Sequence, residues 1–416
     1  MNLRNRRVDL PPGFRRFWWG EAVSGFGTAV TLLALQTLVV VTLHGGAVEV
    51  GWLSSARWLP YLVLGLVVGA LVDRVRRRPV MVATDLIRAI LLGAIPVTWL
   101  LGVLTFPLLL VIVLLFGTVT LVNDAASMSF VPELVPRDQP KRAPAGGADR
   151  DLVPKTGGPA VAGVLIRVVG APLAVLVDAI SYLFSAAMVA TLRSVPEPAA
   201  ASSAKLDVRA LAAEIRDGVR WVYGGSGLAR LAAGTHTWFA AQATLLVAVA
   251  PYAFLQLDLS AFQLGLVYGA AGVGALGGAV LSTTLGHRLG TGGAIICAYA
   301  VSGGAVVVML AAGFVPAGWT AAAVLGVGQF GHGWAMGLSN SHEMTYRQAL
   351  TPDGLQARAN TTMRSLNRAV VVVVSPLAGL AADRLGFAPT LAAAAMIFVV
   401  AAAILALSPI RRARIS

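Results

Sequence analysis

The stretch GALVDRVRRRPVMV, from Gly69 to Val82, places one aspartate and four arginines inside an otherwise apolar region of the chain. Of all 416 residues, 57% are hydrophobic and only 12% are charged, whereas soluble proteins carry about 25% charged residues. A soluble domain of this size cannot bury so much apolar surface. The composition therefore predicts an all-α integral membrane protein, in which the arginine-rich stretch is a polar loop between two helices.

The basic residues do not indicate a nucleic-acid-binding protein, although the formal net charge is +13. They lie between apolar stretches rather than on one face of a soluble domain. Cys297 is the only cysteine, which excludes an internal disulfide, and no cysteine–histidine cluster suggests a metal or another cofactor. No nucleophile–base pair and no phosphate-binding loop indicates an enzyme or an ATP-driven pump.

Twelve segments are long and apolar enough to cross a bilayer as helices, which requires about 20 mostly apolar residues. The predicted spans are 17–43, 49–72, 79–102, 107–135, 153–170, 172–192, 229–253, 261–286, 291–313, 317–346, 360–382 and 387–409.

The distribution of lysine and arginine predicts the orientation, because cytoplasmic loops of membrane proteins are enriched in both. Neither residue occurs in four of the turns between spans, 44–48, 103–106, 254–260 and 314–316. The N-terminal segment, the arginine-rich stretch, the linker at 193–230 and the C-terminal segment are all basic. We therefore expect a multi-pass protein of the plasma (inner) membrane with both termini in the cytoplasm, the N-terminal one as a retained tail rather than a cleaved signal peptide.

The two halves of the sequence resemble each other at an offset of about 216 residues, so that VPRDQPKRAP at 135–144 aligns with TPDGLQARAN at 351–360. This repeat predicts two pseudo-symmetric six-helix halves, a plan found in secondary transporters with a site near the membrane midplane. We place the halves at 1–196 and 229–416, joined by a cytoplasmic linker at 197–228. Apolar residues at helical spacing from Leu206 onward predict a short amphipathic helix in the linker, although a simple tether is the alternative.

The arginine-rich stretch resembles the signature loop of the major facilitator superfamily. The matching residues are Gly69, Leu71, Asp73, Arg74, Arg77 and Arg78, and Arg76 stands where the family pattern has glycine. The resemblance implies the major facilitator fold, with a loop that stabilises the outward-open state by linking the two halves on the inside. Asp73 and Arg74 would provide this link, and the alternative is a run of charges that only sets the orientation.

Other motifs resemble the macrolide-efflux and enterobactin-exporter branch of this superfamily. They are ATDLIRA (83–89), PELVPRDQ (132–139), GGPAVAG (157–163) and ARANTTMRSLNRA (357–369). In the third, Gly158, Pro159 and Gly163 are similar to an antiporter motif that permits a kink and close helix contact. The sequence departs from the pattern in two places. The fourth span lacks the arginine of many proton-coupled drug antiporters, and Pro140 and Pro144 interrupt the following loop.

The resemblance also implies that spans one, four, seven and ten line a central cavity. Polar residues on these spans are candidates for substrate binding and proton coupling: Glu21, Asn123, Asp124, His236, Gln242, Gln329, His332, Asn340, His342 and Glu343. Glu21 and Asp124 are the preferred coupling residues, because apolar surroundings disfavour the charged form of a carboxyl group. Glu21 could instead be a solvated interfacial residue, His236 could be a packed residue, and His342 and Glu343 could belong to the inner end of span ten.

Two pairs of charges lie within the spans. Asp85 and Arg88 are three residues apart on one helical face and are expected to have a structural role, pairing either with each other or with the arginine-rich stretch. Asp178 is a candidate partner of Arg57, since both lie at a similar depth. The GVGALG motif at 272–277 lies within an apolar span, so it is interpreted as a helix-packing motif and not as a nucleotide-binding loop.

Together these features predict a secondary transporter that works by alternating access and functions as a monomer in the lipid bilayer. It would export an amphiphilic small molecule, such as a drug, an antibiotic or a siderophore, in exchange for H+. The alternatives are a facilitator or importer of a small solute, and a non-transporting sensor or partner subunit with the same fold.

Overall fold

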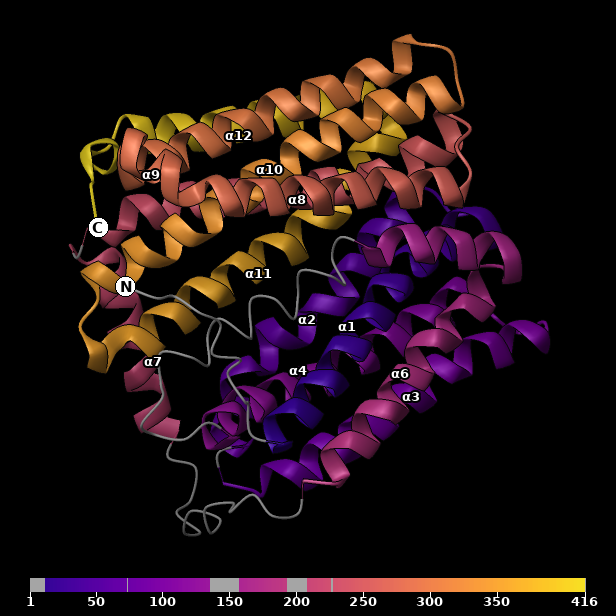
Figure 1. Ribbon diagram of the computed structural model, residues 1–416, viewed down its shortest axis with the longest axis horizontal. Coiled ribbons are helices and arrows are strands. Elements are labelled where there is room, and N and C mark those ends of the chain that lie inside the picture. The colour runs from indigo at the N-terminus through magenta and orange to yellow at the C-terminus, as the bar shows by residue number, and fades with distance from the viewer. Residues whose placement is uncertain (1–11, 73, 135–156, 193–207, 226, 416) are drawn as a thin grey trace, which may run out of the picture.

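The computed structural model describes residues 12–72, 74–134, 157–192, 208–225 and 227–415, and no strand occurs in this part of the chain (Figure 1). Asp73, Pro140 and Pro144 lie outside the described residues. The described helices are α1 (Pro12–Thr37, continued by η1, Leu38–Thr42), α2 (Ala47–Val72), α3 (Arg77–Leu100), α4 (Phe106–Leu134), α6 (Ala171–Ala190), α7 (Val208–Tyr223), α8 (Leu228–Pro251, continued by η3, Tyr252–Gln256), α9 (Ala261–Ala311, continued by η4, Ala312–Phe314), α10 (Trp319–Leu350), α11 (Asp353–Leu385), α12 (Phe387–Ala406) and η5 (Pro409–Arg412). An unlabelled apolar helix at Gly157–Val169 precedes α6.

These helices coincide with the predicted spans and confirm the all-α membrane fold. In the described residues, eight helices are long and apolar enough to cross a membrane. One of them, α9, contains two predicted spans, which meet at Gly290, where φ is 76° and the helix is kinked. The remaining predicted spans correspond to α2, α10 and the shorter helix Gly157–Val169.

The linker contains the predicted amphipathic helix, α7, rather than a simple tether. The side chain of Val222 on α7 is fully buried against Ala232 of α8 and Met363 of α11. On the exposed side of α7, the carboxylates of Asp217 and Glu214 lie 3.4 Å and 3.6 Å from the guanidinium of Arg358. The apolar face therefore attaches α7 to the helices that follow it, since exposed ion pairs add little stability.

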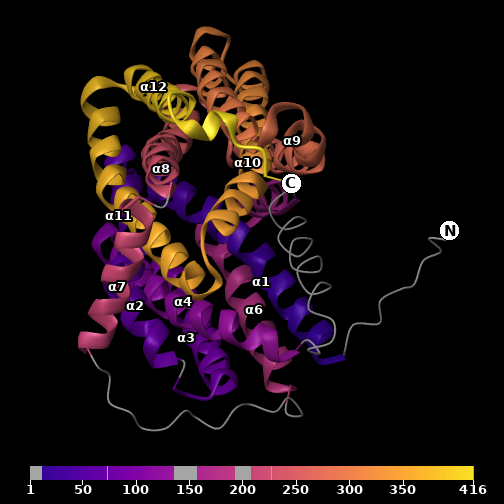
Figure 2. The same cartoon turned by 90° about the vertical axis from the view of Figure 1, so that its left-hand side faces the viewer.

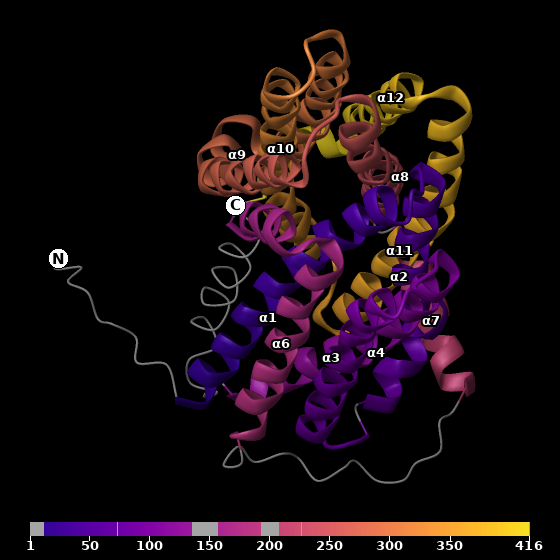
Figure 3. The same ribbon diagram turned by 90° about the vertical axis from the view of Figure 1, so that its right-hand side faces the viewer.

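The helices pack in two groups. In the first helix group, α6 packs on α1 and α3, and α4 packs on α2 and α3. In the second helix group, α8 packs on α11 and α12, and α9 packs on α10 and α12. Views from the two sides show most of the second group, in coral to yellow, above the first group, in indigo to magenta, with α11 descending beside α2 (Figure 2, Figure 3). Among the labelled helices, the most extensive contact between the groups joins α2 to α11.

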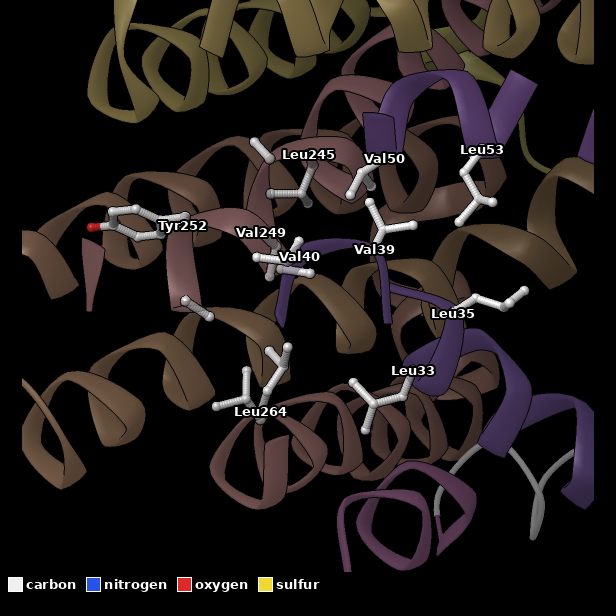
Figure 4. Packing of buried hydrophobic residues seen from close by; sticks show 14 of the residues in the cluster. Leu33, Leu35, Val39, Val40, Val50, Leu53, Leu245, Val249, Tyr252 and Leu264 are labelled. Carbon is white, nitrogen blue, oxygen red and sulfur yellow. The ribbon is translucent and has the colours of Figure 1, made fainter. Parts of the chain in front are cut away.

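At one end of the molecule the two groups are sealed together by apolar side chains. We call it the Gly46 end, after the turn between η1 and α2. Figure 4 shows the seal, in which side chains of the first group face side chains of the second. All ten labelled residues are buried: Leu33, Leu35, Val39, Val40, Val50, Leu53, Leu245, Val249, Tyr252 and Leu264. The backbone N–H of Ala47 also donates to Asp383 Oδ1 of α11 at 3.2 Å.

Small residues bring α9 and α10 into backbone contact. A Cβ added at Gly274 or Gly278 would overlap the α10 backbone, and one added at Gly333 or Gly337 would overlap the α9 backbone. The GVGALG motif therefore serves helix packing, as the sequence predicts.

Substituting glycines of α10 should separate packing from helix propensity. A Cβ at Gly333 would overlap the carbonyl oxygen of Ala271, whereas a Cβ at Gly326 meets nothing within 4 Å. We expect Gly333→Ala to destabilise the fold by about 1–3 kcal/mol and Gly326→Ala to stabilise it by up to about 1 kcal/mol. Thermal unfolding in detergent, followed by circular dichroism, measures both. Equal shifts for the two variants would contradict the close packing of α9 and α10.

Candidate functional site

A cavity of about 620 Å³ lies between the two helix groups. Residues of α1, α2, α3, α4, α6 and the Gly157–Val169 helix line one side, and residues of α8, α9 and α10 line the other. Leu33, Leu245 and Val249 belong both to the cavity wall and to the apolar seal, so the cavity ends at the seal. Farther from the seal, the side chains of Asp124 and Met128 on α4 are exposed.

The two walls of the cavity differ in charge. The charged residues of the lining are Glu21, Arg57, Arg88 and Asp124, and all belong to the first helix group. The second group contributes neutral polar side chains instead: Gln242, Tyr268, Gln329 and His332. Glu21 is half-buried in this lining, so the structure places it in the cavity.

Asp124 is linked through Tyr61 to the second helix group. The hydroxyl of Tyr61 on α2 donates to Asp124 Oδ2 at 2.7 Å. The guanidinium carbon of Arg368 on α11 lies 4.0 Å from the centroid of the Tyr61 ring and 5.3 Å from that of Trp58. A cation over an aromatic face is attracted by the ring quadrupole. A carboxylate of the cavity and a cation of the opposite group therefore share one aromatic side chain.

Asn123 is buried beside Asp124 and connects α4 to α3. Its Nδ2 donates to Thr84 Oγ1 at 2.7 Å and to Asp85 Oδ1 at 3.2 Å. Asp85 forms the predicted ion pair with Arg88, and both side chains are buried. The guanidinium of Arg88 also lies over the ring of Tyr182, with its carbon 4.1 Å from the centroid. These contacts give Asn123 and the Asp85–Arg88 pair a role in joining helices.

In the described residues Arg57 and Asp178 form no direct ion pair, although Arg57 acts electrostatically on the Asp178 carboxyl group. Asp178 is fully buried on α6 and accepts a hydrogen bond from Ser181 Oγ at 3.0 Å. Arg57 faces the cavity, with its guanidinium carbon 6.0 Å from the centroid of the Trp58 ring. Within the described residues no ion pair shorter than 4.0 Å joins the two. Asp178 lies on α6, which packs on α1 and α3.

Four other predicted site residues do not line the cavity. His236 lies between α7 and α11. Its Nε2 is 2.5 Å from the hydroxyl oxygen of Tyr223, and its Nδ1 is 2.6 Å from the side-chain amide oxygen of Asn367. His342 Nε2 lies 3.0 Å from the carbonyl oxygen of Ser282 on α9. Glu343 accepts a hydrogen bond from the Tyr299 hydroxyl at 3.0 Å, and Asn340 is exposed.

The length of α10 explains three of these corrections. The helix continues to Leu350, but Met336 is its last residue in the cavity wall, so Asn340, His342 and Glu343 lie beyond it. His236 is on the side of α8 that faces α7 and α11. Gln242, about one and two-thirds turns farther along α8, does line the cavity as predicted.

The antiporter-like motif packs the Gly157–Val169 helix between the two groups. A Cβ added at Gly158 would lie 2.6 Å from Ala29 Cβ on α1, and one at Gly163 would lie 3.0 Å from Phe262 Cα on α9. Pro159 lines the cavity. The close helix contact predicted for this motif is therefore present.

The described part of the signature loop anchors α3 to α6. Arg78 donates from Nε to the carbonyl oxygen of Val189 at 3.2 Å, and its Nη2 donates to that of Ala190. Gly69 lies on α2 with nothing within 4 Å of an added Cβ. Arg74 and Arg77 flank the same turn, and Asp73 is outside the described residues, so a link between the halves through this loop stays a prediction.

Sequence reasoning missed the part of the site that α2 and α11 provide. It singled out neither Tyr61 nor Trp58, because aromatic residues are common in apolar spans. Arg368, however, lies within the predicted span 360–382, and a charge inside a span is itself a signal for a functional residue. In the described residues no group of three or more histidine, cysteine, aspartate or glutamate side chains is placed to hold a metal ion.

Two helix groups around a cavity with charged residues on one wall define a membrane transporter of the major facilitator type. The family model for transmembrane secretion effectors matches residues 11–415, and the chain belongs to that family. Macrolide efflux protein A of Streptococcus pyogenes is 28% identical over 182 residues, which are 43% of this chain and 44% of that protein. The match thus spans less than half of the relative.

Solved transporters share the fold at low sequence identity. A bacterial homologue of the iron transporter ferroportin, in its inward-facing state, matches with a TM-score of 0.74 and 17% identity over 94% of this chain and 98% of that chain. The nucleoside transporter NupG matches with a TM-score of 0.71 and 13% identity over 95% of this chain and 99% of that chain. These likenesses support the major facilitator fold.

The buried pair of Asp85 and Arg88 should be important for stability. Removing one partner of a buried ion pair leaves an uncompensated charge, which costs about 3–5 kcal/mol. We therefore expect Asp85→Asn to destabilise the protein by an amount in this range. The double variant Asp85→Leu with Arg88→Met removes both charges and should recover part of the loss. Unfolding in mixed micelles measures the three free energies, and a double variant less stable than Asp85→Asn would contradict this role.

Proposed function

We propose that the protein is a secondary active transporter that exports amphiphilic small molecules in exchange for protons. The observation that carries the proposal is the cavity between the two helix groups, which is sealed at one end and contains the exposed carboxylate of Asp124. A site of this kind, exposed alternately to the two sides of the membrane, is the basis of alternating access. The moving units would be the halves 1–196 and 229–416, joined by the linker at 197–228.

The walls of the cavity favour a cation with an apolar body as the cargo. Most of the lining is apolar or aromatic, and it includes Phe116, Leu246 and Trp58. Glu21 and Asp124 supply negative charge on the same wall, where a protonated amine could form a charge-assisted hydrogen bond. The partial similarity to a macrolide efflux protein supports export and an amine-bearing antibiotic as one example of a cargo.

Proton coupling would follow from competition at Asp124. A proton on this carboxyl group removes the charge that holds a cationic cargo, so the cargo and the proton bind alternately. Tyr61 would connect the protonation state of Asp124 to Arg368. Its hydroxyl donates a hydrogen bond to Asp124, and its ring lies against the guanidinium of Arg368 from the opposite group. A change of charge at Asp124 would therefore alter a contact between the two halves, as coupling between binding and movement requires.

The seal at the Gly46 end corresponds to one of the two states of the cycle. Four of the turns at this end contain no lysine or arginine, and by the positive-inside rule this favours a position outside the cell. The cavity would then be accessible from the cytoplasm, where an exporter takes up its cargo. We assign the protein to the plasma membrane with both termini in the cytoplasm, acting as a monomer.

Neutralising Asp124 should abolish driven export. We expect pump-deficient bacteria expressing the wild type to accumulate less ethidium and less erythromycin than control cells, and a protonophore to remove the difference. Asp124→Asn should lose at least about tenfold in cargo affinity, because a hydrogen bond to a charged group contributes about 1.5–3 kcal/mol. The measurement is cellular accumulation of the two compounds at equal expression.

Asp258→Asn is the matched control, because Asp258 is exposed in a turn at the Gly46 end, and asparagine tolerates its positive φ of 51°. Wild-type export by Asp124→Asn would show that another group couples the proton. Greater uptake than in control cells that is insensitive to the protonophore would instead indicate a facilitator.

Cysteine labelling tests both the orientation of the protein in the membrane and the closure of the cavity at the Gly46 end. In a Cys297→Ala background, we expect Met128→Cys to react with an impermeant maleimide only in inverted vesicles, because Met128 is 62% exposed at the end opposite the seal. Thr105→Cys lies in an exposed turn and should react only in intact cells. Val39→Cys, buried in the seal, should react from neither side. The reverse sidedness for Met128 and Thr105 would overturn the orientation.

A further inference from the structure

The neutral wall of the cavity contains a buried polar side chain without a partner. His332 on α10 is only 3% exposed, yet it lines the cavity. Among the described residues neither of its ring nitrogens has a hydrogen-bond partner. Gln242 on α8 lines the same wall, and its amide oxygen is likewise buried and unpaired there. Buried polar groups are nearly always hydrogen-bonded in native proteins, so these atoms require an explanation.

The packing around His332 fixes its ring rather than offering it a partner. The ring is stacked on Trp238, with centroids 6.2 Å apart and an angle of 16° between the planes. The Phe398 ring lies against it as well, with a centroid distance of 5.4 Å. The imidazole is therefore held between aromatic neighbours, and a group bound in the cavity that His332 lines could supply the partner that its nitrogens lack. A rigid, preorganised polar group is typical of a binding site.

We propose that Gln242, Gln329 and His332 form a subsite that hydrogen-bonds a hydroxyl or carbonyl group of the cargo. This inference rests on the proposed function and extends it to the substrate class. The amine of the cargo would bind at the charged wall, near Glu21 and Asp124. The cargo would thus be an amphiphile that joins an amine to a hydroxyl or carbonyl group through an apolar body.

The chemistry of the wall favours a neutral group over a second charge. A neutral imidazole offers one donor and one acceptor, and each carboxamide offers both. A hydroxyl group can satisfy either kind of atom, and a carbonyl group can accept from either kind of residue. All four charged residues of the lining belong to the opposite wall, so this wall provides no countercharge for an ion.

A pair of probes separates this subsite from the charged wall. Erythromycin carries a tertiary amine together with hydroxyl and carbonyl groups, whereas tetraphenylphosphonium is a cation without any hydrogen-bonding group. Binding of each probe to the purified full chain in detergent is measured by equilibrium dialysis. We expect His332→Phe and Gln242→Leu to weaken erythromycin binding about three- to tenfold, the loss of one hydrogen bond, and to leave tetraphenylphosphonium within about twofold. Asp124→Asn should weaken both probes.

Two controls distinguish binding from packing. Gln256→Leu makes the same change at an exposed position outside the cavity and should leave both affinities unchanged. His332→Phe keeps an aromatic ring against Trp238 and removes unpaired polar atoms, so the melting temperature without ligand should be unchanged or raised. A lower melting temperature together with weaker binding of both probes would show that His332 only supports packing, and would overturn the proposal.

The remaining outcomes separate this inference from the proposed function. If the wild type binds both probes, and His332→Phe and Gln242→Leu bind erythromycin as tightly as it does, the subsite is refuted while the transport of amphiphilic cations stands. If the wild type binds neither probe, the proposed substrate class is refuted, and the subsite with it.

Discussion

A charged side chain inside a bilayer requires water, an opposite charge or a polarisable ring, and this requirement organises the described structure. The Asp85–Arg88 pair is buried between helices, where each partner compensates the other. Arg368 rests on Tyr61, and Asp124 accepts a hydrogen bond from the same residue. Glu21 and Arg57 line the cavity, and Arg88 and Asp124 line it while also making these contacts. Helix packing thus gives each of these charges a polar, aromatic or cavity environment.

The two ends of the cavity differ for a related reason. At the Gly46 end, the facing surfaces are mainly apolar, and Gly51 allows α2 to approach α11 so closely that an added Cβ would lie 2.5 Å from the Ser375 carbonyl oxygen. Apart from the hydrogen bond between the Ala47 N–H and Asp383, two such surfaces can part and close again with little change in polar contacts. Around Asp124, closure would bring exposed polar groups together, which is favourable only if a cargo, a proton or a partner residue compensates them. The cavity therefore has one end that closes by packing and one whose closure depends on its contents.

The sequence predicted those features that depend on local pattern. The spans follow from hydropathy, α7 from its apolar periodicity, and the Asp85–Arg88 pair from a spacing of three residues on one helix. The errors concern which way a helix faces after packing. Arg57 and Asp178 lie at a similar depth in the membrane, but Arg57 lines the cavity whereas Asp178 is buried in the helix packing. His236 points toward α7 and α11 rather than into the cavity. Depth is readable from residue number, whereas rotation about the helix axis is set by contacts between distant segments, which a single sequence does not provide.

The absence of an arginine from the fourth span has a structural counterpart. In this chain the basic groups that interact with the Asp124 region come from other helices: Arg368 from α11 interacts electrostatically with both Tyr61 and Asp124, and Arg57 on α2 interacts with Tyr61. A basic group on the same helix as the carboxylate would move with it. In the proposed cycle, a basic group on the opposite half would change its distance when the halves move, so the charge of Asp124 and the position of α11 would influence each other. A carboxylate can in this way be coupled to the conformational change without the arginine that other exporters carry in that span.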